Sequence, residues 1–190
     1  MNIHEISYRA CFKPQLLRFF LEMLTDPGDV VYDPFSGRGT TAVEAALLDR
    51  WVVANDVNPL SEILTRPRLE PPEPALVQKR LEEIPFQEKE TGDQDLSMFF
   101  HERTLSEILS LRNYLSGRRA EGKEDSLDRW IRMVATNRLT GHSKGFFSVY
   151  SLPPNQAVSP EKQRKINQRR NQKPEYRDTR AIIKKRPRTF

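Results

Sequence analysis

The sequence predicts an α/β protein in which an incomplete parallel sheet is followed by a helical insertion and a basic C-terminal tail. A strand, a glycine-rich loop, a helix and a second strand follow one another early in the chain, which is the order of a parallel sheet with a crossover helix. Farther along, apolar residues recur at helical spacing. We therefore expect three parts, formed by residues 1–70, 71–144 and 145–190.

A helix is expected first, because Pro14 suits a first helical turn and apolar residues follow at a spacing of three and four. Its predicted buried face consists of Leu17, Phe20, Leu21 and Leu24. The segment 26–29 then has turn chemistry, and 30–32 is a short β-prone run that ends at Asp33.

The sheet unit continues through a loop at 34–39 and an alanine- and leucine-rich helix at 40–48. Residues 51–54 form the second expected strand, which ends at Asn55 and Asp56. Prolines near residue 70 mark the boundary to the insertion.

The insertion is expected to be mainly helical. Thr104 and Glu107 have the spacing of a capping box, and a second amphipathic helix carries Leu127, Trp130, Ile131 and Val134. We expect Trp51, Trp130, Phe99 and Phe100 to serve packing. Beyond the insertion, 145–150 is β-prone, a polar helix opens at Ser159-Pro160-Glu161, and 179–185 is helix-prone.

Composition limits the class of protein. No run of eighteen apolar residues exists, and the N-terminus lacks the apolar core of a secretory signal, so we expect a cytoplasmic protein. The single cysteine, Cys11, cannot form an internal disulfide or a cysteine-rich zinc site, and we predict no metal site.

Charge is distributed unevenly. Residues 161–190 hold twelve Lys/Arg and three Asp/Glu, a net charge of +9, so the first 160 residues of this +5 chain carry −4. A basic tail on an acidic body indicates either a nucleic-acid partner or a solvated end. The candidates for DNA contact are Arg164, Lys165, Arg169, Arg170 and Lys173.

The loop after the first strand carries the strongest chemical signal. Ligands of open α/β sheets bind at the carboxyl ends of strands, where Asp33 could accept hydrogen bonds from an ammonium group. Asp56 follows 23 residues later at the next strand end, and a carboxylate there can accept from two ribose hydroxyls. Gly37 and Gly39 allow the backbone to approach a ligand closely. Phosphate-loop motifs fit poorly, because Ala42 replaces the third glycine and no Gly-Lys-Ser/Thr occurs.

The motif Asp33-Pro34-Phe35-Ser36-Gly37-Arg38-Gly39-Thr40-Thr41 closely resembles the cofactor motif of DNA methyltransferases that modify the amino groups of adenine or cytosine. Tyr8–Gln15 and Asn55–Leu60 resemble two further motifs of that family. The strong match covers residues 6–68, and a weaker one extends from Asn137 to Arg180.

The resemblance implies a Rossmann-like fold and S-adenosylmethionine (SAM) as cofactor. Asp33, Phe35, Gly37, Gly39 and Asp56 would then line its methionine and ribose, with Phe12 and Lys13 on its other side. The full expected cofactor set is Phe12, Lys13, Asp33, Pro34, Phe35, Ser36, Gly37, Gly39, Thr40, Thr41 and Asp56.

The family's catalytic motif is a polar residue, Pro-Pro and an aromatic residue, which hold the flipped target base. Neither Pro-Pro pair of this chain is followed by an aromatic residue. The candidates for a degenerate catalytic loop are Ser151, Pro153, Pro154 and Asn155, and a proline-stiffened loop is the alternative. Carbon-5 methylation of cytosine is disfavoured because Cys11 lies outside any Pro-Cys loop, and His142 is expected to form hydrogen bonds rather than to act as a base.

We therefore expect a SAM-dependent methyltransferase for an exocyclic amine of adenine or cytosine in DNA, of the kind found in restriction–modification. The chain would be a fragment or one half of a split enzyme, completed by a second chain that carries the Pro-Pro motif. Two alternatives remain: a non-catalytic module that binds SAM and DNA, and an RNA methyltransferase.

Overall fold

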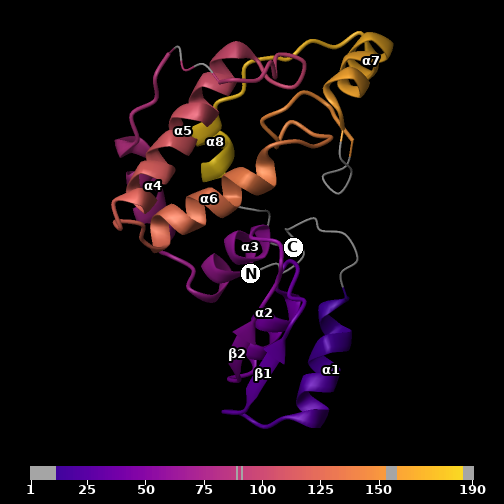
Figure 1. The fold of residues 1–190 in the computed structure, drawn as a ribbon, viewed down its shortest axis with the longest axis vertical. Helices are drawn as coiled ribbons and strands as arrows, with labels where there is room; N and C mark the ends of the chain where they lie inside the picture. Colours follow the sequence, from indigo (N-terminus) through magenta and orange to yellow (C-terminus); the bar gives the residue numbers. More distant parts are fainter. Residues whose placement is uncertain (1–11, 89, 91, 153–157, 186–190) are drawn as a thin grey trace. The chain divides into compact units, whose positions relative to one another are not determined.

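The structure is a computed structural model that describes residues 12–88, 90, 92–152 and 158–185. The chain forms two compact units, one made by the described residues up to Pro71 and the other by those from Pro72 on. Eight helices and two parallel strands occur in the described ranges (Figure 1). This mixture of helices with a small parallel sheet is compatible with the expected incomplete α/β fold.

The first unit contains the predicted strand–loop–helix–strand arrangement. Its elements are α1 (Pro14–Leu24), β1 (Val30–Asp33), α2 (Thr40–Leu47), β2 (Trp51–Ala54) and α3 (Leu60–Leu69). The two strands are parallel and in register from Val30↔Trp51 to Asp33↔Ala54. Because parallel strands share one direction, both strand ends that carry a predicted site residue lie at the same edge of the sheet.

Packing in this unit centres on α2, which contacts both strands and α1. Leu21 of α1 is buried, and Arg18 forms an ion pair of 2.9 Å with the buried Glu44 of α2. The predicted apolar face of α1 is only partly right, since Leu24 is 70% exposed. The reason is that α2 is the main packing partner of α1 among the described residues, and Phe20 and Leu24 stay exposed beside this contact.

The prediction that Trp51 serves packing is wrong, because this side chain is 72% exposed. Side chains alternate between the two faces of a strand. Val31 and Val52 are half-buried, whereas Tyr32 and Trp51 are exposed. Trp51 therefore lies on the sheet face opposite to the half-buried valines, and the sequence pattern does not show which face a helix will cover.

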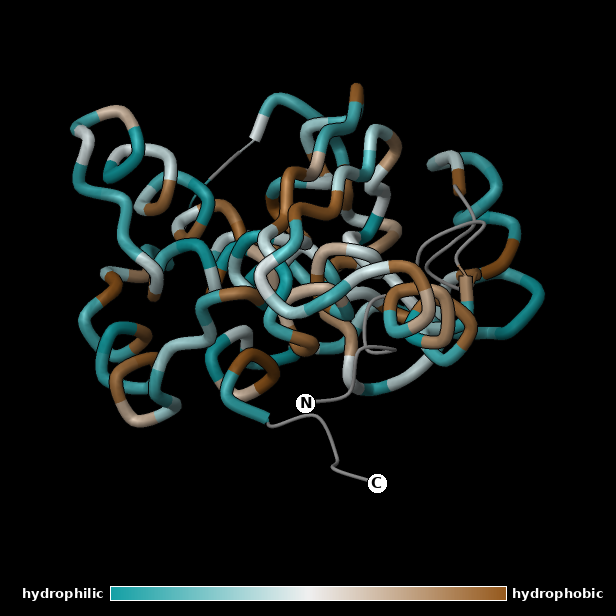
Figure 2. The backbone as a smooth tube through the Cα atoms, turned by 90° about the horizontal axis from the view of Figure 1, so that it is seen from below, coloured by the Kyte–Doolittle hydropathy of each residue, from teal (hydrophilic) through white to brown (hydrophobic). Residues whose placement is uncertain are grey.

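The second unit is helical, as predicted for the insertion. Its elements are α4 (Pro74–Glu83), α5 (Glu102–Ala120), α6 (Ser126–Arg138), α7 (Pro160–Arg170) and α8 (Thr179–Lys184). Its apolar core comprises Val77, Leu81, Ile84, Met98, Phe99, Phe100, Leu111, Leu115, Ile131, Phe147, Ile182 and Ile183. The packing roles of Phe99, Phe100 and Trp130 are confirmed, since the first two belong to this core and Trp130 packs against it. Along the tube in Figure 2, brown apolar residues alternate with teal polar ones, as amphipathic helices require.

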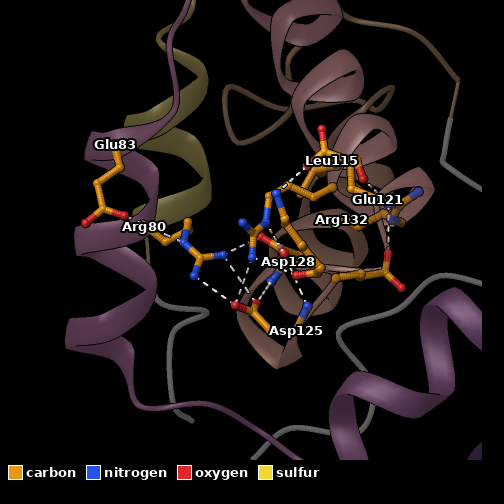
Figure 3. A network of polar contacts seen from close by, with 10 residues as sticks. Arg80, Glu83, Leu115, Glu121, Asp125, Asp128 and Arg132 are labelled. Atoms are coloured by element: carbon orange, nitrogen blue, oxygen red, sulfur yellow. Dashed lines mark hydrogen bonds and ion pairs between the residues drawn. The ribbon is translucent and has the colours of Figure 1, made fainter.

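A buried carboxylate joins three helices of this unit (Figure 3). Asp128 of α6 is fully buried and accepts hydrogen bonds of 2.6 Å from Arg80 of α4 and from Arg118 of α5. Asp125 and Asp128 also form a reciprocal capping box that starts α6. Burial alone would raise the pKa of Asp125, but hydrogen bonds from Arg80 and from the N–H of Asp128, together with the charges of Arg80 and Arg118, outweigh it and hold the pKa below its usual value. The contribution of Asp125 to stability is therefore present above about pH 4 and is lost as the pH falls below that.

The predicted capping box of Thr104 and Glu107 is wrong. Helix α5 begins earlier, and His101 is its N-cap, accepting a hydrogen bond from Arg103 N–H. Thr104 instead exchanges hydrogen bonds with the backbone of Arg177, and Glu107 accepts one of 3.0 Å from the backbone N–H of Thr179. These side chains thus hold the C-terminal segment, a long-range role that local spacing cannot show.

The predicted strand at 145–150 is also wrong. Its backbone N–H groups bond to scattered carbonyls rather than to a neighbouring strand: Phe147 donates to Arg138 and Val149 donates to Phe99, both at 2.8 Å. Residues 146–149 are all buried, so the segment lacks the alternation of buried and exposed side chains that a strand with one solvent-facing side would show. The β-prone residues here serve burial in a compact loop.

The basic segment predicted as a tail is folded from residue 158 to residue 185. Ser159 caps α7, as its sequence indicates, and Gln163 and Ile166 anchor that helix as buried residues. Helix α8 contributes Ile182 and Ile183 to the core. In the described part of the chain no helix has both the length and the apolar character needed to cross a membrane.

Candidate functional site

The loop between β1 and α2 requires glycine at two positions. Gly37 and Gly39 have φ values of +53° and +74°, in the left-handed region that side chains disfavour. Gly39 is also the N-cap of α2 and lies against α3, so that a Cβ atom there would overlap the side chain of Thr65. Backbone conformation and close packing therefore both select glycine at residue 39.

The structure brings the loop to the second acidic strand end. The Asp56 carboxylate accepts hydrogen bonds from Gly37 N–H at 2.7 Å and from Asn58 N–H at 2.8 Å. Beside it, Ser36 N–H donates to the carbonyl of Asn55 at 2.9 Å. At the end of β1, Asp33 accepts from Phe35 N–H at 3.0 Å. Both aspartates thus shape the glycine loop between β1 and α2.

These contacts keep Asp56 ionised. Hydrogen bonds from the N–H groups of Asn58 and Gly37 hold the pKa of this carboxyl below its usual value. A carboxylate has about four acceptor positions on its two oxygens, so acceptor capacity remains after the two backbone bonds. Asp56 can therefore bind hydroxyl donors of a ligand without giving up its contacts with the loop.

A hollow of about 390 Å³ lies next to Asp56, between β2 and α3. It is lined by Val52, Ala54, Asn55, Asp56, Asn58, Pro59, Ser61, Glu62, Thr65, Arg66 and Leu69. Small-molecule sites are hollows of this size, about 300–1,000 Å³. Sequence reasoning missed the α3 residues, although the resemblance of Asn55–Leu60 to a family motif marked the start of that helix.

Two buried hydroxyls near the loop have no hydrogen-bond partner among the described residues. They are the Oγ of Ser36 and the Oγ1 of Thr65, and their residues are 7% and 5% exposed. Buried hydroxyls are usually satisfied. The Thr65 side chain lines the hollow. Thr65 therefore fits a polar ligand in the hollow, whereas Ser36 is not among the residues that line it.

The other predicted cofactor residues differ in their surroundings. Thr40 is the buried first residue of α2, and its hydroxyl accepts a hydrogen bond of 3.1 Å from Arg38. Pro34 and Thr41 are half-buried. Phe35 is 87% exposed, Phe12 is 68% exposed and Lys13 is the N-cap of α1. The closeness of Phe12 and Lys13 to a cofactor stays a prediction.

Of the candidates for catalysis, the structure describes one. Ser151 is 1% exposed, and its N–H donates to the carbonyl of Gly141 at 2.9 Å. Pro153, Pro154 and Asn155 lie outside the described residues. His142 is exposed, with its ring 5.9 Å from that of Phe146.

All five candidates for DNA contact are exposed, and two of them also make contacts within the chain. Arg164 forms an ion pair of 2.9 Å with Asp95, and the Arg170 guanidinium lies 3.8 Å from the centre of the Tyr150 ring. Lys165, Arg169 and Lys173 are exposed.

The tight fit at Gly39 leads to a first prediction. Gly39→Ala is expected to lower the free energy of unfolding by about 2–5 kcal/mol, because left-handed strain costs about 1–2 and overpacking about 1–3. Gly28→Ala is the matched control, since Gly28 also has a positive φ but a Cβ atom there would meet nothing within 4 Å. Urea unfolding followed by circular dichroism measures both, and equal losses would contradict the packing role of Gly39.

Comparisons with known proteins place this site in a class. The family model described as DNA methylase matches residues 2–60, a segment that includes both aspartates and the glycine loop. The resemblance predicted from the sequence is thus confirmed for this N-terminal part, which is similar to DNA amino-methyltransferases.

Individual relatives agree. The Type II methyltransferase M.MvaI of Kocuria varians is 29% identical over 109 residues, which cover 53% of this chain and 23% of the relative. The Type II methyltransferase M.MjaII of Methanocaldococcus jannaschii is 31% identical over 70 residues, which cover 36% of this chain and 13% of the relative. The matched stretches thus span less than a quarter of either relative. No solved structure matches the chain significantly.

Proposed function

We propose that this chain binds SAM in a Rossmann-like site and serves the methylation of an exocyclic amine of adenine or cytosine in DNA. The observation that carries the proposal is the hydrogen bond of 2.7 Å from Gly37 to Asp56, which joins the glycine loop to the second strand end. The family match over residues 2–60 supports the same assignment. A structural turn would also use glycine, but it would not need an ionised carboxylate beside a hollow.

Each part of the site has a role toward the cofactor. The carboxylate of Asp56 would accept hydrogen bonds from the two ribose hydroxyls, as acidic residues at second strand ends do in nucleotide-binding sheets. Asp33 would accept from the ammonium group, since its carboxylate lies at the end of the adjacent strand. The hydroxyl of Thr65, which lines the hollow, would gain the partner that the described residues do not supply.

When bound, SAM supplies an electrophilic methyl group on a sulfonium. The residues above orient that reactant, whereas the target amine needs a polar group, two prolines and an aromatic residue around a flipped base. No such sequence occurs in this chain. We assign that half of the reaction to sequence outside these 190 residues, either in the same protein or in a second chain.

Calorimetric titration with SAM and with its demethylated product tests the cofactor site. Asp56→Ala is expected to weaken binding by about 10- to 100-fold, because hydrogen bonds to a charged group are lost. Asp56→Asn keeps one acceptor oxygen for the loop, so comparing the two variants separates ligand contact from support of Gly37.

Glu22→Ala, an exposed change on α1, is the control for altered charge and should leave the affinity unchanged. A folded Asp56→Ala variant with the affinity of the unmodified protein would show that Asp56 has no ribose role. Circular dichroism of each variant establishes that it is folded.

A second candidate function is a SAM- and DNA-binding polypeptide without turnover. The absence of an aromatic residue after either Pro-Pro pair favours it. Both candidates share the cofactor site, and transfer of labelled methyl groups distinguishes them. An RNA methyltransferase is distinguished by measuring the transfer of labelled methyl groups to RNA and to DNA in parallel.

A further inference from the structure

Helix α7 is held firmly in its unit by one face. Gln163 is fully buried and Ile166 is 5% exposed. The Gln163 side chain donates to the carbonyl of Tyr150 at 2.9 Å, and Asn167 donates to the carbonyl of Met98 at 2.8 Å. A helix anchored in this way presents its remaining side chains in fixed directions. In Figure 1, α7 stands apart from the group formed by α4, α5, α6 and α8.

Two cations of α7 are already engaged. Arg164 pairs with Asp95 at 2.9 Å, and Arg170 lies over the Tyr150 ring at 3.8 Å from its centre. Asp95 is kept ionised for this pairing, because hydrogen bonds from Ser97 and then from Arg164 hold its pKa below the usual value. The exposed Arg164–Asp95 pair is weak in itself, but a phosphate at Arg164 would also lie beside the negative charge of Asp95.

Three other cations form a continuous stripe. Lys162, Lys165 and Arg169 are spaced by three and four residues, which places them on one side of a helix. All three are exposed, and none has an ion pair with a carboxylate in the described part of the chain. Successive residues of a helix are about 100° apart around its axis, so each of the three cations lies at least about 100° from Arg164. Because Arg164 contacts Asp95, the stripe is turned away from that carboxylate.

We propose that Lys162, Lys165 and Arg169 form a phosphate-contacting stripe for double-stranded DNA, and that Arg164 and Arg170 do not take part. This assignment deepens the proposed function and rests on it for the choice of DNA. From its first to its last cation the stripe extends about 10 Å along the helix, comparable with three successive rises of about 3.4 Å between phosphates of one strand. The exposed side of α7 carries no large apolar residue, which disfavours insertion into a membrane surface.

The experiment measures the salt dependence of binding to a fluorescent duplex of mixed sequence, about two helical turns long, by anisotropy and without cofactor. The stripe variant replaces Lys162, Lys165 and Arg169 by glutamine. The control variant replaces Lys79, Arg112 and Arg119 by glutamine, which removes the same charge from exposed positions of the same unit. Arg164→Gln tests the exclusion of the paired arginine.

Each phosphate contact contributes about −0.9 to the slope of log affinity against log salt. The slope of the stripe variant should therefore be smaller in magnitude by about 2.7. Between about 50 and 200 mM salt, the loss of affinity of the unmodified protein should be about 40 times as large as the loss of affinity of the stripe variant. The control variant and Arg164→Gln should keep the slope of the unmodified protein.

Equal slopes for the stripe and control variants would overturn the assignment, as would an unmodified protein that does not bind the duplex. Tighter binding to an RNA duplex of the same length, or to an acidic polypeptide, would overturn the choice of DNA. Cofactor affinity is measured separately, so a failed stripe is distinguishable from a failed cofactor site. The three residues are exposed, and thermal unfolding of the variant establishes that α7 is retained.

Discussion

Incubated alone with SAM and mixed-sequence DNA, this chain is expected to transfer methyl groups at least about 10⁵-fold more slowly than a methyltransferase that holds both reactants. The physical reason is that methyl transfer needs the amine nitrogen in line with the sulfonium methyl group. The site at Asp33–Asp56 orients the methyl donor, but the sequence contains no Pro-Pro pair followed by an aromatic residue that would hold the flipped base.

A tritiated-methyl assay measures this, with purified M.MvaI as the positive control in the same buffer. Turnover by the chain alone at a rate similar to the control, abolished by Pro154→Ala or Asn155→Ala, would identify 151–155 as the catalytic loop. It would overturn the assignment of the catalytic half to sequence outside these 190 residues. Loss of any residual signal in Asp56→Ala would show that it arises from the SAM site of this chain rather than from a contaminant.

Replacing Asp128 by alanine is expected to lower the free energy of unfolding by about 3–5 kcal/mol, the range for removing one partner of a buried ion pair. Asp128 is fully buried, and its loss would leave the guanidinium groups of Arg80 and Arg118 facing each other, with only the half-exposed Asp125 between them. The change also removes one half of the capping box that starts α6. Chemical denaturation followed by circular dichroism measures the loss.

Glu121→Ala is the matched control. Its carboxylate forms an ion pair with Lys123 in which both side chains are more than half exposed, and exposed pairs contribute about 0–1 kcal/mol. Asp128→Asn should fall between the two variants, because an amide keeps one acceptor for Arg118 or Arg80 but loses the charge. An Asp128→Ala variant as stable as Glu121→Ala would show that the three helices are held by their apolar core alone.

Short-range patterns predicted the elements near the site. The run Val30–Tyr32, the glycine loop and the alanine-rich helix indicate a strand, a turn and a crossover that follow one another closely, and the structure has these elements where they were expected. The positions of Asp33 and Asp56 could be predicted as well, because two parallel strands end at the same edge of the sheet. Close spacing along the chain made the candidate site predictable.

Long-range packing decided what the patterns could not. The spacing of Thr104 and Glu107 is that of a cap, yet these side chains bind Arg177 and Thr179, far along the chain. The β-prone run that contains Trp51 does not show which face of the sheet a helix covers. Trp51 lies on the exposed face. Such partners come together only in the folded chain.

By itself the sequence determined the family resemblance of the N-terminal part, the acidic strand ends and the glycines of the loop, because each depends on residue types a few positions apart. The tertiary structure alone decided that Thr65 packs against Gly39, that Asp128 joins three helices, and which cations of α7 are already paired. Those contacts depend on where distant helices meet. That is set by the shape of the whole apolar core, which no local spacing records.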